Sequence, residues 1–135
     1  MYDVNTSGIL NNSVLKWNSS SEKFEPSASL SLRSITPHSI TTTANCTNSI
    51  NFYTTASTAK TITFTNVVDG ISGQVEVSYS GAAKITFASS GYTVNIASNI
   101  YDSAAKVLSK TSGTAIYSYY IRNSKIYING TQAYK

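Results

Sequence analysis

The sequence predicts an all-β protein: an antiparallel β-sandwich of the jelly-roll kind, preceded by an extended N-terminal arm that carries a short β-hairpin. Composition is the first reason, because the 135 residues include 10 Tyr but only 12% charged residues, and Ser and Thr are abundant. Such a composition favours pleated sheet and exposed turns over helix. The second reason is that apolar and polar residues alternate from Gly70 onward, with glycine-containing turns between the runs.

The alternating runs predict strands at residues 49–54, 60–65, 74–79, 83–88 and 92–97, joined by tight turns such as "DG" and "SSG". The residues expected to point into the core are Ile50, Phe52, Ile62, Phe64, Val75, Val77, Tyr79, Ile85, Phe87, Tyr92, Val94 and Ile96. Residues 114–130 predict a final hairpin that reverses at Arg122, Asn123 and Ser124. Residues 101–110 could hold a helical turn. About eight short, evenly spaced strands are typical of a sandwich or barrel.

Residues 1–40 differ from the rest of the chain. Apolar residues are sparse there, and the segments "NSSSEK" and "TPHSITTT" are typical of turns and linkers. We therefore expect a separate N-terminal arm over residues 1–40 and a β-sandwich domain over residues 41–135.

The segment "VLKWNSSSEKFEP" in this arm contains the only Trp of the chain. Residues 14–17 predict a strand, residues 18–23 a polar turn and residues 24–26 the returning strand, so Leu15, Trp17 and Phe24 would share one hairpin. An isolated hairpin is marginal in water, and burying each of these side chains is worth about 1.5–3 kcal/mol. We expect them to pack against symmetry copies of the chain or against another protein.

The same segment resembles a short element of tailed-bacteriophage fibre proteins, in which an aliphatic pair precedes "W-N/D" and a Ser/Thr-rich turn leads to "K-F/W-x-P/N". The C-terminal stretch "SYYIRNSKIYINGTQAYK" resembles the knob domains that cap such fibres. The resemblance implies a structural virion protein that forms a homotrimer, with residues 1–40 as its attachment and trimerisation arm and residues 41–135 as its knob. It also implies that Leu15, Trp17 and Phe24 make the trimer contact or the contact with another capsid or tail protein.

The expected arm and knob follow one another with almost nothing between them. This favours a short head fibre or capsid decoration protein, made in the host cytoplasm and incorporated into the virion, over a tail fibre. A tail-fibre knob and a carbohydrate-binding module of a bacterial surface or secreted system are the alternatives.

We predict no catalytic, cofactor or metal site, and the chain is not expected to be an enzyme. Asp69 and Glu76 are the only acidic pair close together in the expected knob, and Asp69 begins a "DG" turn. His38 and Cys46 lack a third residue at a spacing that suits catalysis or metal binding, so we expect a linker histidine and a buried thiol. The net charge of +4 is scattered, which disfavours nucleic acid as a partner. Membrane insertion is not expected either, because no apolar run reaches the roughly 20 residues of a membrane span.

Tyr117, Tyr119, Tyr120 and Tyr127 lie in the predicted final hairpin. Alternation cannot bury both faces of "YSYY", so some of these rings should be exposed. An exposed Tyr offers a rigid apolar face with a hydroxyl and suits stacking on sugar rings. The four residues are therefore the candidate contacts to a host-surface glycan. The alternative is that they line the core or the trimer axis.

Overall fold

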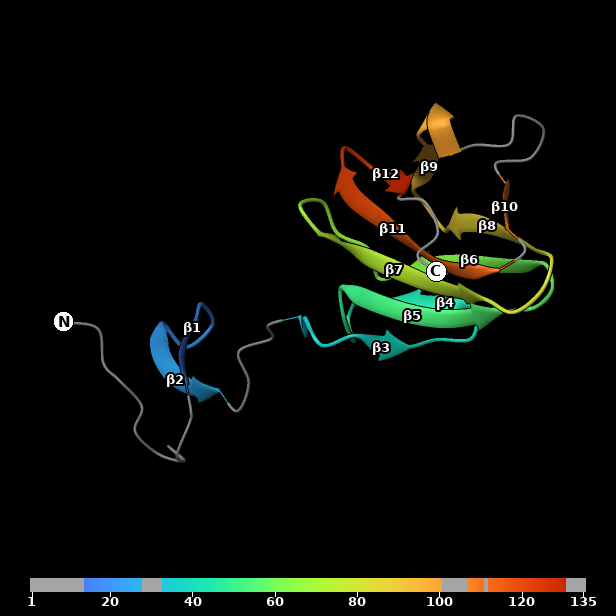
Figure 1. The fold of residues 1–135 in the computed structure, drawn as a ribbon. Coiled ribbons are helices and arrows are strands. Elements are labelled where there is room, and N and C mark those ends of the chain that lie inside the picture. Colours follow the sequence, from blue (N-terminus) through green and yellow to red (C-terminus); the bar gives the residue numbers. More distant parts are fainter. Residues whose placement is uncertain (1–13, 28–32, 101–106, 111, 131–135) are drawn as a thin grey trace. The chain divides into compact units, whose positions relative to one another are not determined.

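The computed structural model describes residues 14–27, 33–100, 107–110 and 112–130 (Figure 1). The chain divides into two compact units, Met1–Leu32 and Arg33–Lys135. The boundary therefore lies before Arg33, whereas the sequence analysis placed it after Ile40. Arg33 and Ile40 belong to the second unit because Arg33 Nε donates a hydrogen bond to Cys46 O (2.8 Å) and the Ile40 side chain is buried in the core.

The described part of the first unit is a β-hairpin. β1 (Val14–Asn18) pairs antiparallel with β2 (Lys23–Ser27), and Trp17 lies directly opposite Phe24. Glu22, with a φ of 51°, provides the left-handed conformation in the turn between them. The predicted hairpin is thus confirmed.

The described part of the second unit contains two sheets. The six-stranded sheet has the order β3-β5-β7-β11-β12-β9, and the four-stranded sheet has the order β10-β8-β6-β4. Their strands are β3 (His38–Ser39), β4 (Thr43–Asn45), β5 (Asn51–Ala56), β6 (Lys60–Thr65), β7 (Ser72–Tyr79), β8 (Ala83–Ser89), β9 (Thr93–Ile96), β10 (Val107–Lys110), β11 (Gly113–Arg122) and β12 (Lys125–Gly130).

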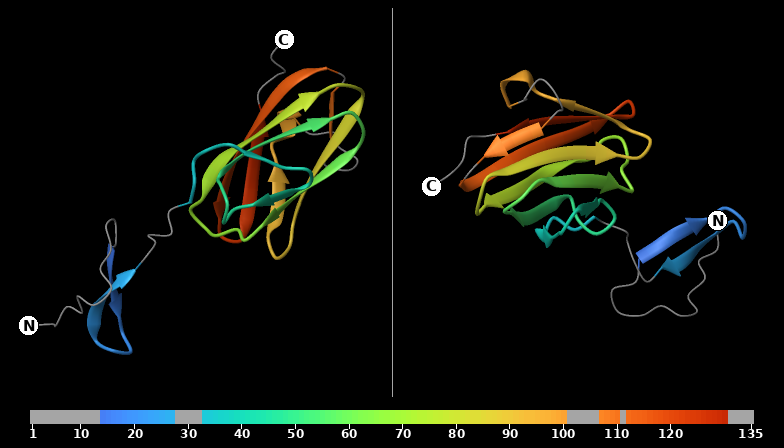
Figure 2. Two further views of the ribbon diagram at one scale, coloured as in Figure 1. Left: turned by 90° about the horizontal axis from the view of Figure 1, so that it is seen from below. Right: turned by 90° about the vertical axis from the view of Figure 1, so that its right-hand side faces the viewer.

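From β3 to β8, consecutive strands alternate between the two sheets, so the chain winds in coils (Figure 2). β5 pairs in parallel with β7, while β6, which connects them, lies in the other sheet and pairs in parallel with β8. Parallel strands need a crossover connection, and here each crossover is itself a strand. β11 and β12 then form an antiparallel hairpin beside β7, and β9 pairs with the far side of β12.

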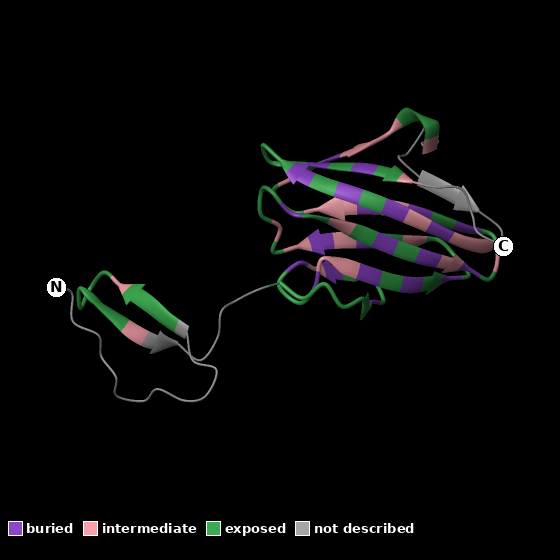
Figure 3. Ribbon diagram, turned by 60° about the vertical axis from the view of Figure 1, so that its left-hand side comes forward, coloured by how far each residue is buried: buried purple, intermediate pink, exposed green. Residues whose placement is uncertain are grey.

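The core lies where the two sheets contact each other. Along β7, β11 and β12 buried and exposed residues alternate (Figure 3). Aromatic rings join the sheets: the ring centroids of Phe64 on β6 and Tyr119 on β11 are 4.8 Å apart, and those of Phe87 on β8 and Tyr117 on β11 are 5.4 Å apart. The residues predicted to point inward all belong to this core or pack against it, which confirms the predicted faces of the strands.

The all-β prediction is confirmed, but the prediction of an antiparallel arrangement is wrong. The pairs β3–β5, β5–β7, β4–β6, β6–β8 and β9–β12 are parallel. The reason is that short connections such as Ser57–Ala59 lead from one sheet to the other instead of closing hairpins.

The helical turn considered for residues 101–110 is absent from Val107–Lys110, which form β10; residues 101–106 lie outside the described ranges. A short 3₁₀ helix, η1, occupies Ser98–Ile100. Among the described residues, no helix is long and apolar enough to cross a membrane.

Candidate functional site

The outer face of the six-stranded sheet brings two exposed tyrosines and several amide side chains together. Tyr120 of β11 lies directly opposite Tyr127 of β12, and Tyr127 lies opposite Asn95 of β9. Two residues before Tyr120 on β11, Ser118 lies opposite Gln74 of the neighbouring strand β7. The strand pairing alone therefore places two aromatic rings and an amide side by side, with more polar groups next to them.

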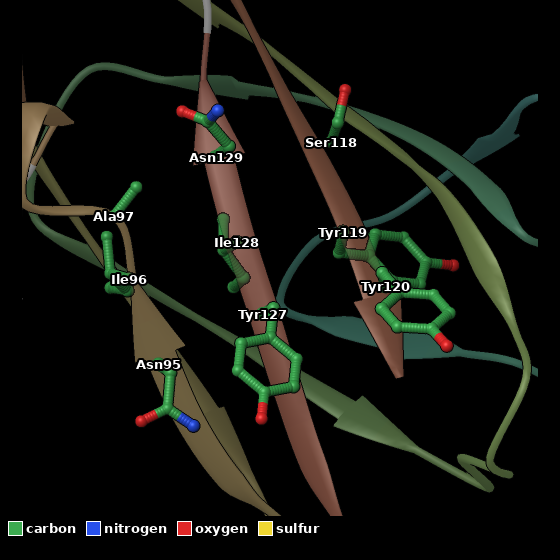
Figure 4. Close-up of a pocket in the computed structure, with 9 residues that line it drawn as sticks. All are labelled: Asn95, Ile96, Ala97, Ser118, Tyr119, Tyr120, Tyr127, Ile128 and Asn129. Carbon is green, nitrogen blue, oxygen red and sulfur yellow. The ribbon is translucent and has the colours of Figure 1, made fainter. Parts of the chain in front are cut away.

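The Tyr120–Tyr127 pair borders a hollow of about 400 Å³. Figure 4 shows Tyr127 between Asn95 on one side and Tyr120 on the other. Each tyrosine is 44% exposed. The Asn95 Nδ2 atom is buried and has no hydrogen-bond partner among the described residues. A buried donor without an acceptor costs about 1–3 kcal/mol.

The turn between β11 and β12 holds the two tyrosines in register. Asn123 and Ser124 both have a positive φ, 52° and 56°, as in a two-residue type I′ turn. The Asp69 carboxylate accepts hydrogen bonds from the Asn123 and Ser124 backbone N–H groups at 2.7 and 3.3 Å. The sequence predicted the reversal at this position. It treated Asp69 as an ordinary turn residue, whereas the structure shows that Asp69, from the loop between β6 and β7, stabilises the β11–β12 turn.

Two of the four candidate tyrosines point into the core instead. Tyr117 and Tyr119 are 2% and 3% exposed, so neither can contact a ligand on the surface, and they are withdrawn as receptor contacts. The Tyr117 hydroxyl shares a hydrogen bond of 2.7 Å with the Tyr79 hydroxyl, and the Tyr119 hydroxyl donates to Ile50 O at 2.7 Å. Burial raises the pKa of Tyr79, Tyr117 and Tyr119 above the ordinary tyrosine value.

The hairpin of the first unit has one apolar and one polar face. Leu15, Trp17 and Phe24 are 49%, 40% and 38% exposed, and the Trp17 and Phe24 rings meet edge to face with centroids 5.2 Å apart. Strand alternation puts Leu15 and Trp17 on one face. On the other face, Asn18 Nδ2 donates to Glu25 Oε2 at 2.8 Å. Hydrogen bonds from Asn18 and Ser21 lower the pKa of the Glu25 carboxyl.

The residues weighed for chemistry are spread over the second unit. His38 lies on the exposed edge strand β3, and Glu76 points outward from β7. Cys46 is buried, as expected, and its burial raises the pKa of the thiol. Within the described ranges, no three His, Cys, Asp or Glu side chains lie close enough to hold a metal ion.

Two residues of the outer face were missed by the sequence analysis. Asn95 alternates with the core residues Val94 and Ile96, so its outward direction could have been inferred. Its position beside Tyr127 could not, because it depends on the parallel pairing of β9 with β12. The outward direction of Tyr53, which is 45% exposed on β5, could also have been inferred from alternation, but its neighbours across the sheet could not.

Comparison of the chain with protein-family models, curated proteins and solved structures returns no match.

Proposed function

We propose that this chain is a structural virion protein of a tailed bacteriophage, a short homotrimeric fibre or decoration protein whose knob adheres to a glycan on the host surface. The observation that carries the adhesive function is the exposed Tyr120–Tyr127 pair beside the hollow that Asn95 also lines. Tyrosine rings stack on the apolar faces of sugar rings, and an amide donates and accepts hydrogen bonds with sugar hydroxyls.

The attachment function rests on the two-faced hairpin. Leu15, Trp17 and Phe24 expose a compact apolar surface on a hairpin whose other face is polar. Apolar surface of this kind is typical of a protein contact. Together with the resemblance to phage fibre elements, this supports a trimer contact or a contact with another virion protein.

For the knob, we further propose a sandwich of two facing sheets wound in coils. The contacts of Phe64 and Phe87 with tyrosines of the other sheet support two packed layers. The parallel pairs support coils in place of the Greek-key order of a jelly roll.

A single site of this size should bind weakly, with a dissociation constant of about 1 mM. Three copies on one fibre, and many fibres on one particle, can raise the apparent affinity by roughly 10²–10⁴. Weak individual sites therefore suffice for adhesion.

The adhesive function can be tested on an array of bacterial surface polysaccharides probed with the full chain displayed multivalently on beads. We expect glycan binding that falls roughly tenfold or more in the Tyr120→Ala, Tyr127→Ala double variant, because each ring contributes about 0.5–1.5 kcal/mol. Lys84→Ala, an exposed change on the other sheet, is the control and should bind normally. Absence of binding by the unaltered protein, or equal binding by the double variant, would contradict the proposal.

The attachment function has a separate test. Trp17→Ala should leave the knob folded but reduce the trimer fraction in light scattering and the amount of protein incorporated into particles. A monomeric unaltered protein that binds glycan tightly would instead favour the alternative of a carbohydrate-binding module.

A further inference from the structure

The outer face of the six-stranded sheet is hollowed well beyond the Tyr120–Tyr127 pair. A second depression lies over β7 and shares Ser118 with the first, and a third lies beside Tyr53 and shares Gln74 with the second. The three depressions therefore adjoin one another along this face, and together we call them the sheet groove. It runs from Tyr127 on β12 to Tyr53 on β5.

The lining of the sheet groove changes along its length. Exposed tyrosines stand at both ends, whereas the middle is formed by small polar groups that include Ser72, Gln74 and Ser118. Gln74 and Ser118 are exposed on this face and line the middle of the groove. Among the described residues that line the groove, Glu76 is the only charged one.

The two aromatic ends are too far apart for one sugar ring. Tyr53 lies opposite Glu76, which lies opposite Ile116, and Tyr120 follows Ile116 by four residues on β11. With strands about 4.8 Å apart and a rise of about 3.3 Å per residue, the Cα atoms of Tyr53 and Tyr120 are separated by roughly 16 Å. A tetrasaccharide can span such a distance, but a disaccharide cannot.

We propose that the sheet groove binds a neutral, linear oligosaccharide of about four units, with Tyr53 as a second stacking subsite. The proposal rests on the proposed glycan-binding function and adds the length and charge of the ligand to it. Stacking at the two ends fixes the chain, and the amide and hydroxyl groups of the middle bind sugar hydroxyls. Glu76 disfavours an anionic sugar next to Tyr53. The described lining holds no cation to attract one, since Arg122 and Lys125 lie beyond Tyr120 and Tyr127 at the other end of this face.

The test uses glucose, N-acetylglucosamine and their cello-, malto- and chito-oligosaccharides of two to six units, titrated into the full chain and followed by NMR. We expect affinity for at least one series to rise about tenfold between the disaccharide and the tetrasaccharide and then to level off. Tyr53→Ala should abolish this gain without changing disaccharide affinity, and Tyr53→Phe should retain it. Tyr127→Ala should weaken every length. Thr55→Ala, on the same strand but outside the groove lining, is the control.

Each other outcome overturns a defined part of the reasoning. Binding without a gain in length, or with no effect of Tyr53→Ala, would overturn the second subsite but leave the glycan-binding function standing. Absence of binding in every series, with binding retained on the polysaccharide array, would overturn the neutral oligosaccharide alone, whereas absence of binding in both assays would overturn the glycan-binding function as well. A change of oligomeric state in the Tyr53→Ala variant, measured by light scattering, would overturn the oligosaccharide in favour of a second copy of the chain as the occupant of the groove.

Discussion

Replacing Tyr119 and Tyr120 by alanine, one at a time, should distinguish the effect on stability of a core residue from that of a surface residue. The two residues are neighbours on β11, but Tyr119 is 3% exposed and Tyr120 is 44% exposed. The Tyr119 ring packs on Phe64, and its hydroxyl donates a hydrogen bond to Ile50 O. Tyr120 points to the opposite face, where its direct cross-strand neighbour is Tyr127.

The expected losses of unfolding free energy differ several-fold. Tyr119→Ala removes a buried ring, which costs about 3–5 kcal/mol, whereas Tyr119→Phe removes only a hydrogen bond with a net worth of about 1 kcal/mol. The phenylalanine variant loses little because Ile50 O still accepts a hydrogen bond from Gln74 N. Tyr120→Ala removes a cross-strand contact worth about 0.2–1 kcal/mol. For a domain of roughly 100 residues, 1 kcal/mol shifts the melting temperature by about 4–8 °C.

Thermal unfolding followed by circular dichroism should therefore show a drop of about 12 °C or more for Tyr119→Ala, about 4–8 °C for Tyr119→Phe and at most about 8 °C for Tyr120→Ala. Tyrosine signals in the near ultraviolet report on the knob, while fluorescence of Trp17, the only Trp of the chain, reports on the first unit. If Tyr120→Ala were as destabilising as Tyr119→Ala, the side chains of β11 would be assigned to the wrong faces. A slip of one residue reverses every side chain of a strand, and the candidate site would then be wrong as well.

Three further changes test the support of the fold. Gly73→Ala should destabilise the knob by several kcal/mol or prevent folding, because its Cβ would overlap Ile50 O; a normal urea midpoint would contradict the close approach of these backbones. Asp69→Ala should lower stability by about 1–3 kcal/mol, since the β11–β12 turn loses a charged acceptor, and hydrogen exchange at that turn should accelerate. Stability should also fall as the pH rises above about 10, because tyrosines of the unfolded chain ionise there while the buried Tyr79 and Tyr117 have raised pKa values and stay neutral. A melting temperature that is constant up to pH 11 would contradict this.

The sequence predicted the faces of the strands better than it predicted their partners. Val75 and Val77 alternate with polar residues on β7, and a strand with one buried face must have this pattern whichever strand pairs with it. The three-residue connection Ser57–Ala59 is as short as a hairpin loop, yet it crosses to the other sheet. Because a hairpin and a crossover both bury one face of each strand, periodicity cannot distinguish them.

In the candidate site too, the sequence predicts which face each tyrosine takes but not which residues lie beside it across the sheet. Ser118 and Arg122 share a face of β11, which marks that face as the exposed one and assigns Tyr120 to it. Tyr119 then belongs to the core, so this distinction could have been made from the sequence. The neighbours of Tyr120 across the sheet could not, since Asn95 reaches Tyr127 only through the pairing of β9 with β12.

The division of each strand between core and surface bears on how the proposed ligand specificity of the knob could change. On β11, Tyr119 packs between the sheets while Tyr120 lines the groove, and on β12 Ile128 and Tyr127 divide in the same way. Substitutions on the groove face remove no core contact, so they cost little stability. The backbone is stabilised separately, by the pairing of the strands and by the Asp69 hydrogen bonds to the β11–β12 turn. Under the proposed adhesive function, groove residues such as Tyr53 and Tyr127 can therefore be exchanged independently of the residues that make the knob fold.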